Sequence, residues 1–310
     1  MPRKIIIDTD PGKDDAVAIL LALASPAELE VLALVAVAGN VPVTRTEGNA
    51  RRLAELAGRP DLPVYAGCAR PLLRTPITAE HVHGDTGLHG LDLPEPRTPR
   101  RPEHGVDYLV DTLRAAAPGE VTLCLLGPAT NLAVALVKAP EIAERIAEVV
   151  WMAGARSEGG NVTPAAEFNV HADPDAARVV LGSGVPLTLL PLDLTHQVRL
   201  TPDRMARLLR VGTAAARAVA ALFASDGGPV RERGGSPLHD PCVIAHLLRP
   251  GLFTGQRINV AVETGSPLTL GMTVADRYGV TGRAPNAMWL DRVDADGFFD
   301  LLFERLARLP

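Results

Sequence analysis

Residues 5–19 read Ile-Ile-Ile-Asp-Thr-Asp-Pro-Gly-Lys-Asp-Asp-Ala-Val-Ala-Ile. The isoleucine run predicts a buried strand that ends near Asp8, followed by a Pro-Gly turn and a helix that carries the last two aspartates. Asp8, Asp10, Asp14 and Asp15 fall within eight residues, and such crowding is unfavourable unless a cation or bound protons relieve the repulsion. One aspartate before a helix is commonly a cap, whereas four at one turn predict a site for a hard cation, Ca²⁺ or Mg²⁺.

The composition predicts a compact protein without a nucleic-acid or membrane partner. The chain has 310 residues, of which 47% are hydrophobic, and its formal net charge is -5. Such a chain can bury a large core, its charge argues against nucleic acid, and no apolar stretch is long enough to span a bilayer. Three scattered cysteines without a pairing pattern favour a reducing compartment. We therefore expect one domain over residues 1–310 in a soluble, cytoplasmic protein.

Apolar strand-like runs alternate with helical patterns along the chain. The strands are continuous apolar runs, as in a sheet covered on both faces, and this order predicts an α/β fold with an open, mostly parallel, Rossmann-like sheet. The expected strands are 4–8, 30–37, 63–66, 121–126, 149–152 and 186–190, with a later pair near 256–263 and 268–274. The expected helices are 14–24, 43–57, 105–117, 129–138, 174–183, 202–210, 213–224 and 295–308. Two long segments, 67–104 and 225–239, are predicted loops, and loops of this length are usually functional or disordered.

Unusual polar residues follow several of these strands. Ligands of open α/β sheets bind at the carboxyl ends of the strands, so these residues are expected to meet at one edge. Neutral amides there suit a ligand rich in hydroxyl groups, such as a sugar. Asn40 could instead be a left-handed turn residue, and Asn131 is expected to open a helix. The residues concerned are Asp8 and Asp10, Asn40, residues 127–131, residues 160–169 and Asp193.

Two histidine motifs lie in the long loops. His83 belongs to His-Val-His-Gly-Asp-Thr-Gly at 81–87, and His239 precedes Asp240. A neighbouring carboxylate can tune the pKa of a histidine for proton donation near neutral pH, although Asp240 could equally cap the following helix. His81 and His89 are expected to be structural or merely exposed.

These motifs, taken together, resemble the nucleoside hydrolases of the inosine-uridine-preferring type. The aspartate turn at 8–15 is the most specific of them, and five others follow in the order of that family. They are Ala38-Gly39-Asn40, His83-Gly84-Asp85-Thr86-Gly87-Leu88, Gly127-Pro128-Ala129-Thr130-Asn131, Glu167-Phe168-Asn169 and His239-Asp240. The resemblance implies an open α/β sheet, a dimer or tetramer, and hydrolysis of the N-glycosidic bond of ribonucleosides.

The resemblance also implies roles for individual residues. Ca²⁺ would be held by Asp10, Asp15, Asp240 and the backbone carbonyl of Leu126. The sugar would be bound by Asp14, Asn161, Glu167 and Asn169, with Phe168 beside the substrate and Asn40 near the attacking water.

The implied chemistry passes through an oxocarbenium-like ribosyl cation. A metal ion lowers the pKa of its bound water, and Asp10 would take the water's proton. His239 is the candidate proton donor to the leaving base, with His83 as its helper or as a base-binding residue. The pair of histidines favours uridine and cytidine over purine nucleosides, with inosine as a further candidate substrate. Arg231, Glu232 and Arg233 stand where relatives often place other base contacts, which leaves base recognition open.

Two alternatives remain at the level of sequence. A haloacid-dehalogenase-type phosphatase would use Asp8 as nucleophile and Mg²⁺ as metal, but it expects Thr or Val where Gly12 stands. A non-catalytic nucleoside-binding protein would keep the pocket without turnover, and the complete set of acidic residues argues against it. An EF-hand is excluded, because Ile19 occupies the place of the bidentate glutamate.

Overall fold

The computed structural model describes residues 1–224 and 234–310. Within them, nine strands form one sheet in the order β10-β9-β11-β6-β5-β4-β1-β2-β3. Neighbours from β11 through β6 to β3 run parallel, while β9 is antiparallel to both β10 and β11. The strands are β1 (Arg3–Thr9), β2 (Leu29–Ala36), β3 (Val64–Ala66), β4 (Val121–Leu125), β5 (Ile146–Trp151), β6 (Leu187–Leu189), β9 (Phe253–Val262), β10 (Thr273–Asp276) and β11 (Ala287–Val293). The predicted open, mostly parallel sheet is confirmed.

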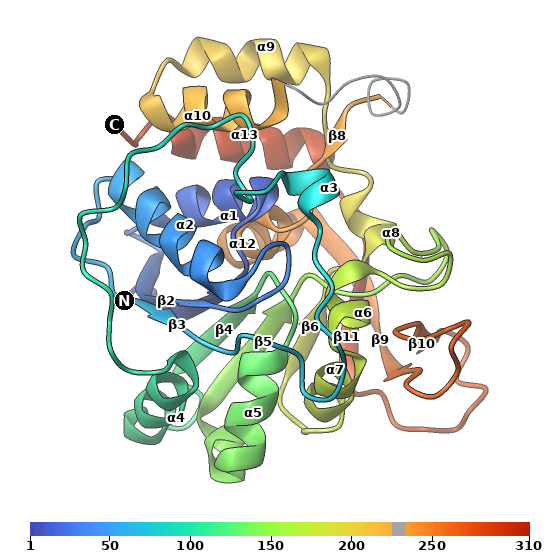
Figure 1. Cartoon of the computed structure of the whole chain (residues 1–310). Coiled ribbons are helices and arrows are strands. Elements are labelled where there is room, and N and C mark those ends of the chain that lie inside the picture. Colours follow the sequence, from blue (N-terminus) through green and yellow to red (C-terminus); the bar gives the residue numbers. More distant parts are fainter. Residues whose placement is uncertain (225–233) are drawn as a thin grey trace.

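Helices cover both faces of this sheet (Figure 1). One face carries α1 (Lys13–Leu23), α2 (Val43–Leu56) and α12 (Pro241–Leu248), with α9 (Pro202–Val211), α10 (Ala214–Ala224) and α13 (Ala295–Leu306) stacked beyond them. The other face carries α4 (Gly105–Ala115), α5 (Thr130–Lys138) and α7 (Pro174–Leu181). Short elements complete the chain: α3 (Glu80–His83), α6 (Phe168–Ala172), α8 (Leu192–Thr195), β7 (Arg199–Leu200), β8 (Ser236–Pro237) and the 3₁₀ helices η1 (Pro140–Arg145) and η2 (Pro250–Leu252).

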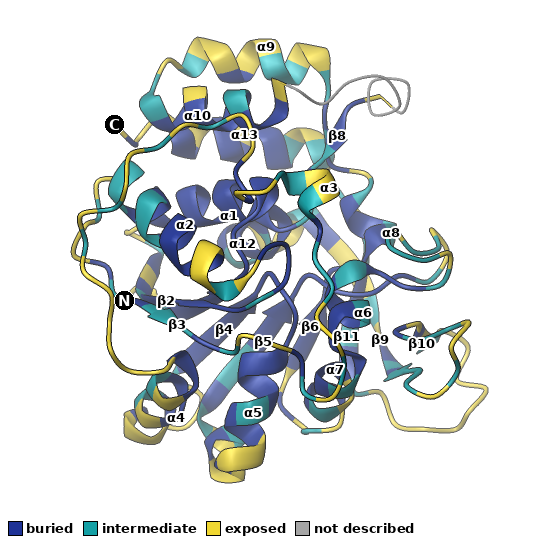
Figure 2. Cartoon of the chain, in the orientation of Figure 1, coloured by how far each residue is buried: buried dark blue, intermediate teal, exposed yellow. Residues whose placement is uncertain are grey.

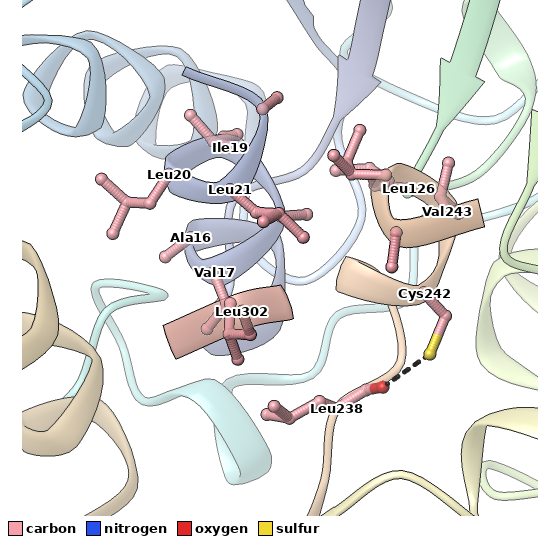
Figure 3. Packing of buried hydrophobic residues seen from close by; sticks show 14 of the residues in the cluster. Ala16, Val17, Ile19, Leu20, Leu21, Leu126, Leu238, Cys242, Val243 and Leu302 are labelled. Carbon is pink, nitrogen blue, oxygen red and sulfur yellow. Dashed lines mark hydrogen bonds between the residues drawn. The ribbon is translucent and has the colours of Figure 1, made fainter. Parts of the chain in front are cut away.

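The first strand and helix lie at the centre of the molecule. Ile5 and Ile7 belong to the core on the α1 side of the sheet, and Ile6 belongs to the core on the α5 side. Every residue of α1 is buried (Figure 2). In Figure 3, α1 packs beside Leu302 of α13 and near Cys242 of α12, whose Sγ donates to the carbonyl of Leu238. The aspartate turn is therefore fixed by the best-packed part of the fold.

The C-terminal third departs from the sequence prediction in two places. The strand expected at 268–274 begins only at Thr273, because Met272 N bonds to Thr269 O in a turn and Gly271 has φ of 79°. β11 was not predicted. Its second half contains Asp291 and Arg292, so the strand lacks the continuous apolar run of the others. It pairs with β6 only through Met288 and Trp289.

The predicted long loop at 67–104 contains only α3. Before α3 it passes α7, where Arg74 Nε donates to Asp175 Oδ2 at 3.0 Å, and after α3 it passes α2 (Figure 1). Side chains of α2 hold it in place: Arg51 Nη1 donates to Thr98 O at 2.8 Å, and Glu55 Oε1 accepts from Thr98 N at 2.6 Å. Among the described residues, no helix combines the length and apolar character that a bilayer span requires.

β1 lies between β2 and β4. The chain leaves β1 toward β2 and β3 and then returns to β4 on the other side. Ligands of open α/β sheets bind outside the carboxyl ends of the strands at such a reversal. The end of β1 is the aspartate turn.

Candidate active site

The carboxylate of Asp15 closes the aspartate turn. Its Oδ1 accepts from Thr9 Oγ1 at 2.6 Å and from Asp10 N at 3.2 Å, while its Oδ2 accepts from Gly12 N at 3.0 Å. Asn40, which follows β2, joins the same network: its backbone N donates to Asp10 Oδ2 at 2.7 Å and its Nδ2 to Asp15 Oδ2 at 3.2 Å. Asn40 has no positive φ, so the left-handed turn alternative is wrong and its side chain serves the acidic network.

Two glycines make room for the carboxylate of Asp10. A Cβ at Gly39 would lie 2.0 Å from Asp10 Oδ2, and a Cβ at Gly127 would lie 2.4 Å from Asp10 Oδ1. Since Gly39 follows β2 and Gly127 follows β4, the neighbouring strands on both sides of β1 leave space for this one side chain.

Three carboxyl groups gather beside this turn. One oxygen from each of Asp14, Asp15 and Asp240 lies within 4.8 Å of the others. Asp240 occupies the N-cap position of α12 but makes no capping hydrogen bond, so the cap alternative is not realised. Burial, followed by repulsion from the neighbouring carboxylates, raises the pKa of Asp240 well above its ordinary value, and the pKa values of Asp10 and Asp15 are raised by the same causes. Crowded, buried oxygen ligands of this kind fit a hard divalent cation.

A cavity of about 640 Å³ opens above the acidic cluster. Ten of the residues proposed from the sequence line it: Asp14, Asn40, His83, Leu126, Asn161, Glu167, Phe168, Asn169, His239 and Asp240. Asp10 and Asp15 are buried and are linked to the cavity through the hydrogen bonds of Asn40.

One wall of the cavity is built by the segment that leads into α6. Glu167 caps this helix, accepting from Asn169 N at 2.8 Å and Val170 N at 3.3 Å, and it also accepts from Gly154 N at 3.0 Å. Burial nevertheless raises the pKa of Glu167 to about 7. Asn161 Oδ1 accepts from Phe168 N at 2.9 Å and so closes the loop between them.

Asn169 links this wall to the strand ends. Its Nδ2 donates to the carbonyl oxygens of Leu126 at 2.7 Å and Met152 at 3.0 Å. A carbonyl oxygen has two lone pairs, so Leu126 keeps one for a further partner.

The two predicted histidines lie on different elements of the cavity lining. His83 ends α3, and His239 lies just before α12. His83 Nδ1 accepts from Lys13 N at 3.1 Å, so its proton is on Nε2. His239 Nδ1 is paired with Thr195 Oγ1 at 2.8 Å. The expectation that Asp240 tunes His239 near neutral pH is wrong, because burial and the nearby positive charges of His196, His83 and Arg199 lower the pKa of His239 to about 3.

Several cavity residues were not recognised from the sequence. His81 and His89 were expected to be structural or exposed; both are exposed, yet both line the cavity. Arg199 and Phe223 lie in segments without any motif, and only the pairing of β7 with β8 brings Arg199 close to His239. His196 also lines the cavity, and its Nδ1 pairs with Glu158 Oε2 at 2.9 Å. Arg231, Glu232 and Arg233 lie outside the described residues.

Comparison with known proteins agrees with this geometry. The profile of the "Inosine-uridine preferring nucleoside hydrolase" family matches residues 5–300. A pyrimidine-specific ribonucleoside hydrolase, RihA, of Salmonella gallinarum is 45% identical over 310 residues, 99% of each chain. An uncharacterized protein of Schizosaccharomyces pombe is 50% identical over 99% of this chain and 100% of that protein.

Solved structures share the whole fold. The plant nucleoside hydrolase PpNRh1 superimposes with a TM-score of 0.91 at 33% identity, over 99% of each chain. A purine-preferring ribonucleoside hydrolase from Gardnerella vaginalis gives a TM-score of 0.91 at 31% identity, over 98% of each chain. The phosphatase alternative is thereby excluded. The chain belongs to the inosine-uridine-preferring nucleoside hydrolase family and is a ribonucleoside N-glycosidase.

Proposed function

We propose that the protein is a Ca²⁺-dependent hydrolase that releases base and ribose from uridine and cytidine. One observation supports this most strongly: Asp14, Asp15 and Asp240 meet within 4.8 Å beside a cavity walled by Asn161, Glu167 and Asn169. The first group suits a cation, and the second suits sugar hydroxyls.

The cation would be held by the carboxylates of Asp10, Asp15 and Asp240 and by the carbonyl of Leu126. All four donors are oxygen, as Ca²⁺ prefers. When bound, the ion would acidify the attacking water and hold hydroxyl groups of the ribose.

Asp10 would take the proton of the attacking water. Asn40 N already fixes Asp10 Oδ2 at 2.7 Å, and the two flanking glycines leave the space that the carboxylate occupies. A preset base of this kind lowers the cost of reaching the reactive geometry. Asn40 lines the cavity and would orient the water.

The ribose would be bound by Asp14, Asn161, Glu167 and Asn169, with Phe168 against the substrate. Carboxylates and amide oxygens around the ring would stabilise the positive charge that develops on the sugar in the transition state.

The base would lie against His83 and His239. With a pKa of about 3, His239 is neutral at neutral pH, so we propose that it donates a hydrogen bond to the base. Support for pyrimidines comes from the 45% identity to a relative named pyrimidine-specific, compared with 31% to a structure named purine-preferring. We further propose that the protein is cytoplasmic and forms a homodimer or homotetramer. Light scattering after gel filtration would test the oligomeric state.

Ribose release from a nucleoside panel tests this function. The panel comprises uridine, cytidine, inosine, adenosine, guanosine and 2′-deoxyuridine, each with and without a Ca²⁺ chelator. We expect chelator-sensitive release, fastest from uridine and cytidine and much slower from 2′-deoxyuridine. Asp10→Asn should lose about 10²–10⁴-fold in kcat, the range of general-base catalysis, while Asp111→Asn on the distant α4 should match the wild type. Nucleoside binding without release would overturn the hydrolase mechanism.

A further inference from the structure

Arg199 lies at a defined place in the cavity that the proposed mechanism leaves unused. It belongs to β7, where Arg199 pairs with Pro237 of β8, and Leu238 N donates to Val198 O at 2.9 Å. This pairing carries the chain directly into His239. Both Arg199 and His239 line the cavity, so the strand pair sets the guanidinium beside the proposed base-binding histidine.

The guanidinium of Arg199 makes few contacts with the part of the chain that the structure describes. Within residues 1–224 and 234–310 its Nη1 donates to Gly235 O at 3.2 Å, and it forms no ion pair. That carbonyl is neutral, so the positive charge is not cancelled by it. Arginine offers five N–H donors and stays protonated at any working pH.

The lining of the cavity carries charges of both signs on different elements. Asp14 and Asp240 lie with the acidic cluster, where the sugar's positive charge would develop. Arg199 lies with His239, Phe223 and Pro237 on the lining formed by β7, β8 and the end of α10. A nucleoside bound with its ribose on the acidic cluster would direct its base toward this lining.

The chemistry of a pyrimidine requires charge stabilisation there. When the C1′–N1 bond of uridine breaks, its electron pair passes to N1 and is delocalised onto O2 and O4. Uracil has no basic ring nitrogen corresponding to purine N7, so it leaves as an anion unless an acid protonates it. The water oxygen bonds to C1′ and gives its proton to Asp10, from which solvent returns one proton to the departed base.

We propose that Arg199 contacts the departing pyrimidine at its carbonyl edge and stabilises the negative charge that forms on it, so that Arg199 is a catalytic residue that favours pyrimidine over purine nucleosides. This inference rests on the proposed function. Because the base is neutral before bond cleavage and anionic afterwards, the interaction is stronger in the transition state than in the ground state and acts on kcat.

A leaving-group comparison tests this role. Uridine, inosine and 4-nitrophenyl β-D-ribofuranoside are assayed with wild type, Arg199→Met, Arg199→Lys and, as a control, Arg207→Met on the outer helix α9. For Arg199→Met we expect kcat on uridine to fall about 10²–10³-fold, as when one oxyanion-stabilising donor is removed. The nitrophenyl riboside, whose leaving group is a stable anion without help, should lose less than about tenfold, and inosine should lose less than uridine. Arg199→Lys should retain part of the uridine activity.

Equal losses on uridine and on the nitrophenyl riboside would overturn the inference, because they would show that Arg199 only holds the carbonyl of Gly235. Unchanged uridine turnover would overturn it too. Thermal unfolding of each variant identifies misfolding. If Arg199→Met misfolds, Arg199→Lys is compared with the wild type on the same substrates. If the wild type cleaves neither uridine nor the nitrophenyl riboside, the proposed function itself is refuted.

Discussion

At the scale of single residues, the site depends on the space left around Asp10. Gly39 and Gly127 contribute no side chain, and each faces one oxygen of the same carboxylate. Their role follows from close approach alone, since neither has a positive φ.

Gly39→Ala should therefore impair catalysis more than folding. The new Cβ would lie 2.0 Å from Asp10 Oδ2 and 2.9 Å from Pro128 Cδ, so the carboxylate must move. A displacement of about 1 Å can lower turnover about 10²-fold, and we expect a kcat loss of that order. Gly251→Ala is the matched control, because nothing lies within 4 Å of its Cβ position. Full activity of the Gly39 variant would contradict the role assigned to Asp10.

Glu167 should make the stability of the protein depend on pH. Burial raises its pKa from 4.5 to about 7, so between these values the folded protein holds a proton that the unfolded chain has released. Stability contributed by this group is present below about pH 4.5 and is lost as the pH rises through about 7. The loss amounts to about 3 kcal/mol.

Denaturant unfolding from pH 5 to pH 8 measures this effect. Glu167→Gln should flatten the decline in the free energy of unfolding, whereas Glu103→Gln, at an exposed position, should not. Identical slopes for the wild type and Glu167→Gln would show that Glu167 is not protonated in the folded protein at pH 5.

At the scale of elements, α2 holds the His83 loop against the aspartate turn. Asn49, buried in α2, donates through Nδ2 to Thr86 O at 2.7 Å and to Pro11 O at 3.2 Å. The same side chain thus fixes both the loop at 84–87 and the turn before α1. His83 connects the same two segments, because its Nδ1 accepts from Lys13 N.

Asn49→Ala should weaken catalysis through this connection. Two hydrogen bonds of about 0.5–1.5 kcal/mol each are removed, so we expect kcat/KM to fall about 5- to 150-fold. Asn286→Ala is the control: Asn286 Nδ2 also donates to two carbonyls, those of Leu181 and Val260, but it lies outside the cavity lining. Equal activity losses in both variants would indicate general destabilisation rather than a positioning role for Asn49.

The elements that were predicted best from the sequence are those whose residues show a single hydrophobic pattern. α1 and residues 5–9 of β1 are buried, so an isoleucine run and an apolar helix identified them. The acidic turn and the amides at strand ends pointed to the residues proposed for the sugar and the metal, because buried polar groups need hydrogen-bond or ionic partners. Arg199, His196 and Phe223 have no such signal. A two-residue strand carries Arg199, His196 follows the short helix α8, and Phe223 lies near the end of α10, so only the tertiary fold brings them to the cavity.

At the scale of the whole molecule, the acidic cluster opposes folding until its charge is relieved. Asp10, Asp15 and Asp240 lie among the ends of central elements, and burial raises the pKa of each. A cation that binds only the folded state should therefore stabilise the entire domain.

Saturating Ca²⁺ should raise the melting temperature of chelator-treated protein. At a hundredfold excess over Kd, binding contributes about 2.7 kcal/mol, which for a chain of this length corresponds to about 4 °C. Asp240→Asn should lose most of this increase, while Asp111→Asn should keep it. An equal increase in Asp240→Asn would place the cation elsewhere, and no increase in the wild type would argue against a Ca²⁺ site.

The two ends of the cavity are built by different parts of the fold. Its acidic end is made by the central strands and by the wholly buried helix α1, where any substitution disturbs the core. The rest of its lining comes from the irregular segment 67–104, from β7 and β8, and from the end of α10. The residues that contact the base can thus differ between proteins of this fold without any change in the acidic cluster. The near-identical fold of a purine-preferring relative, with a TM-score of 0.91 at 31% identity, is the outcome that such a division permits.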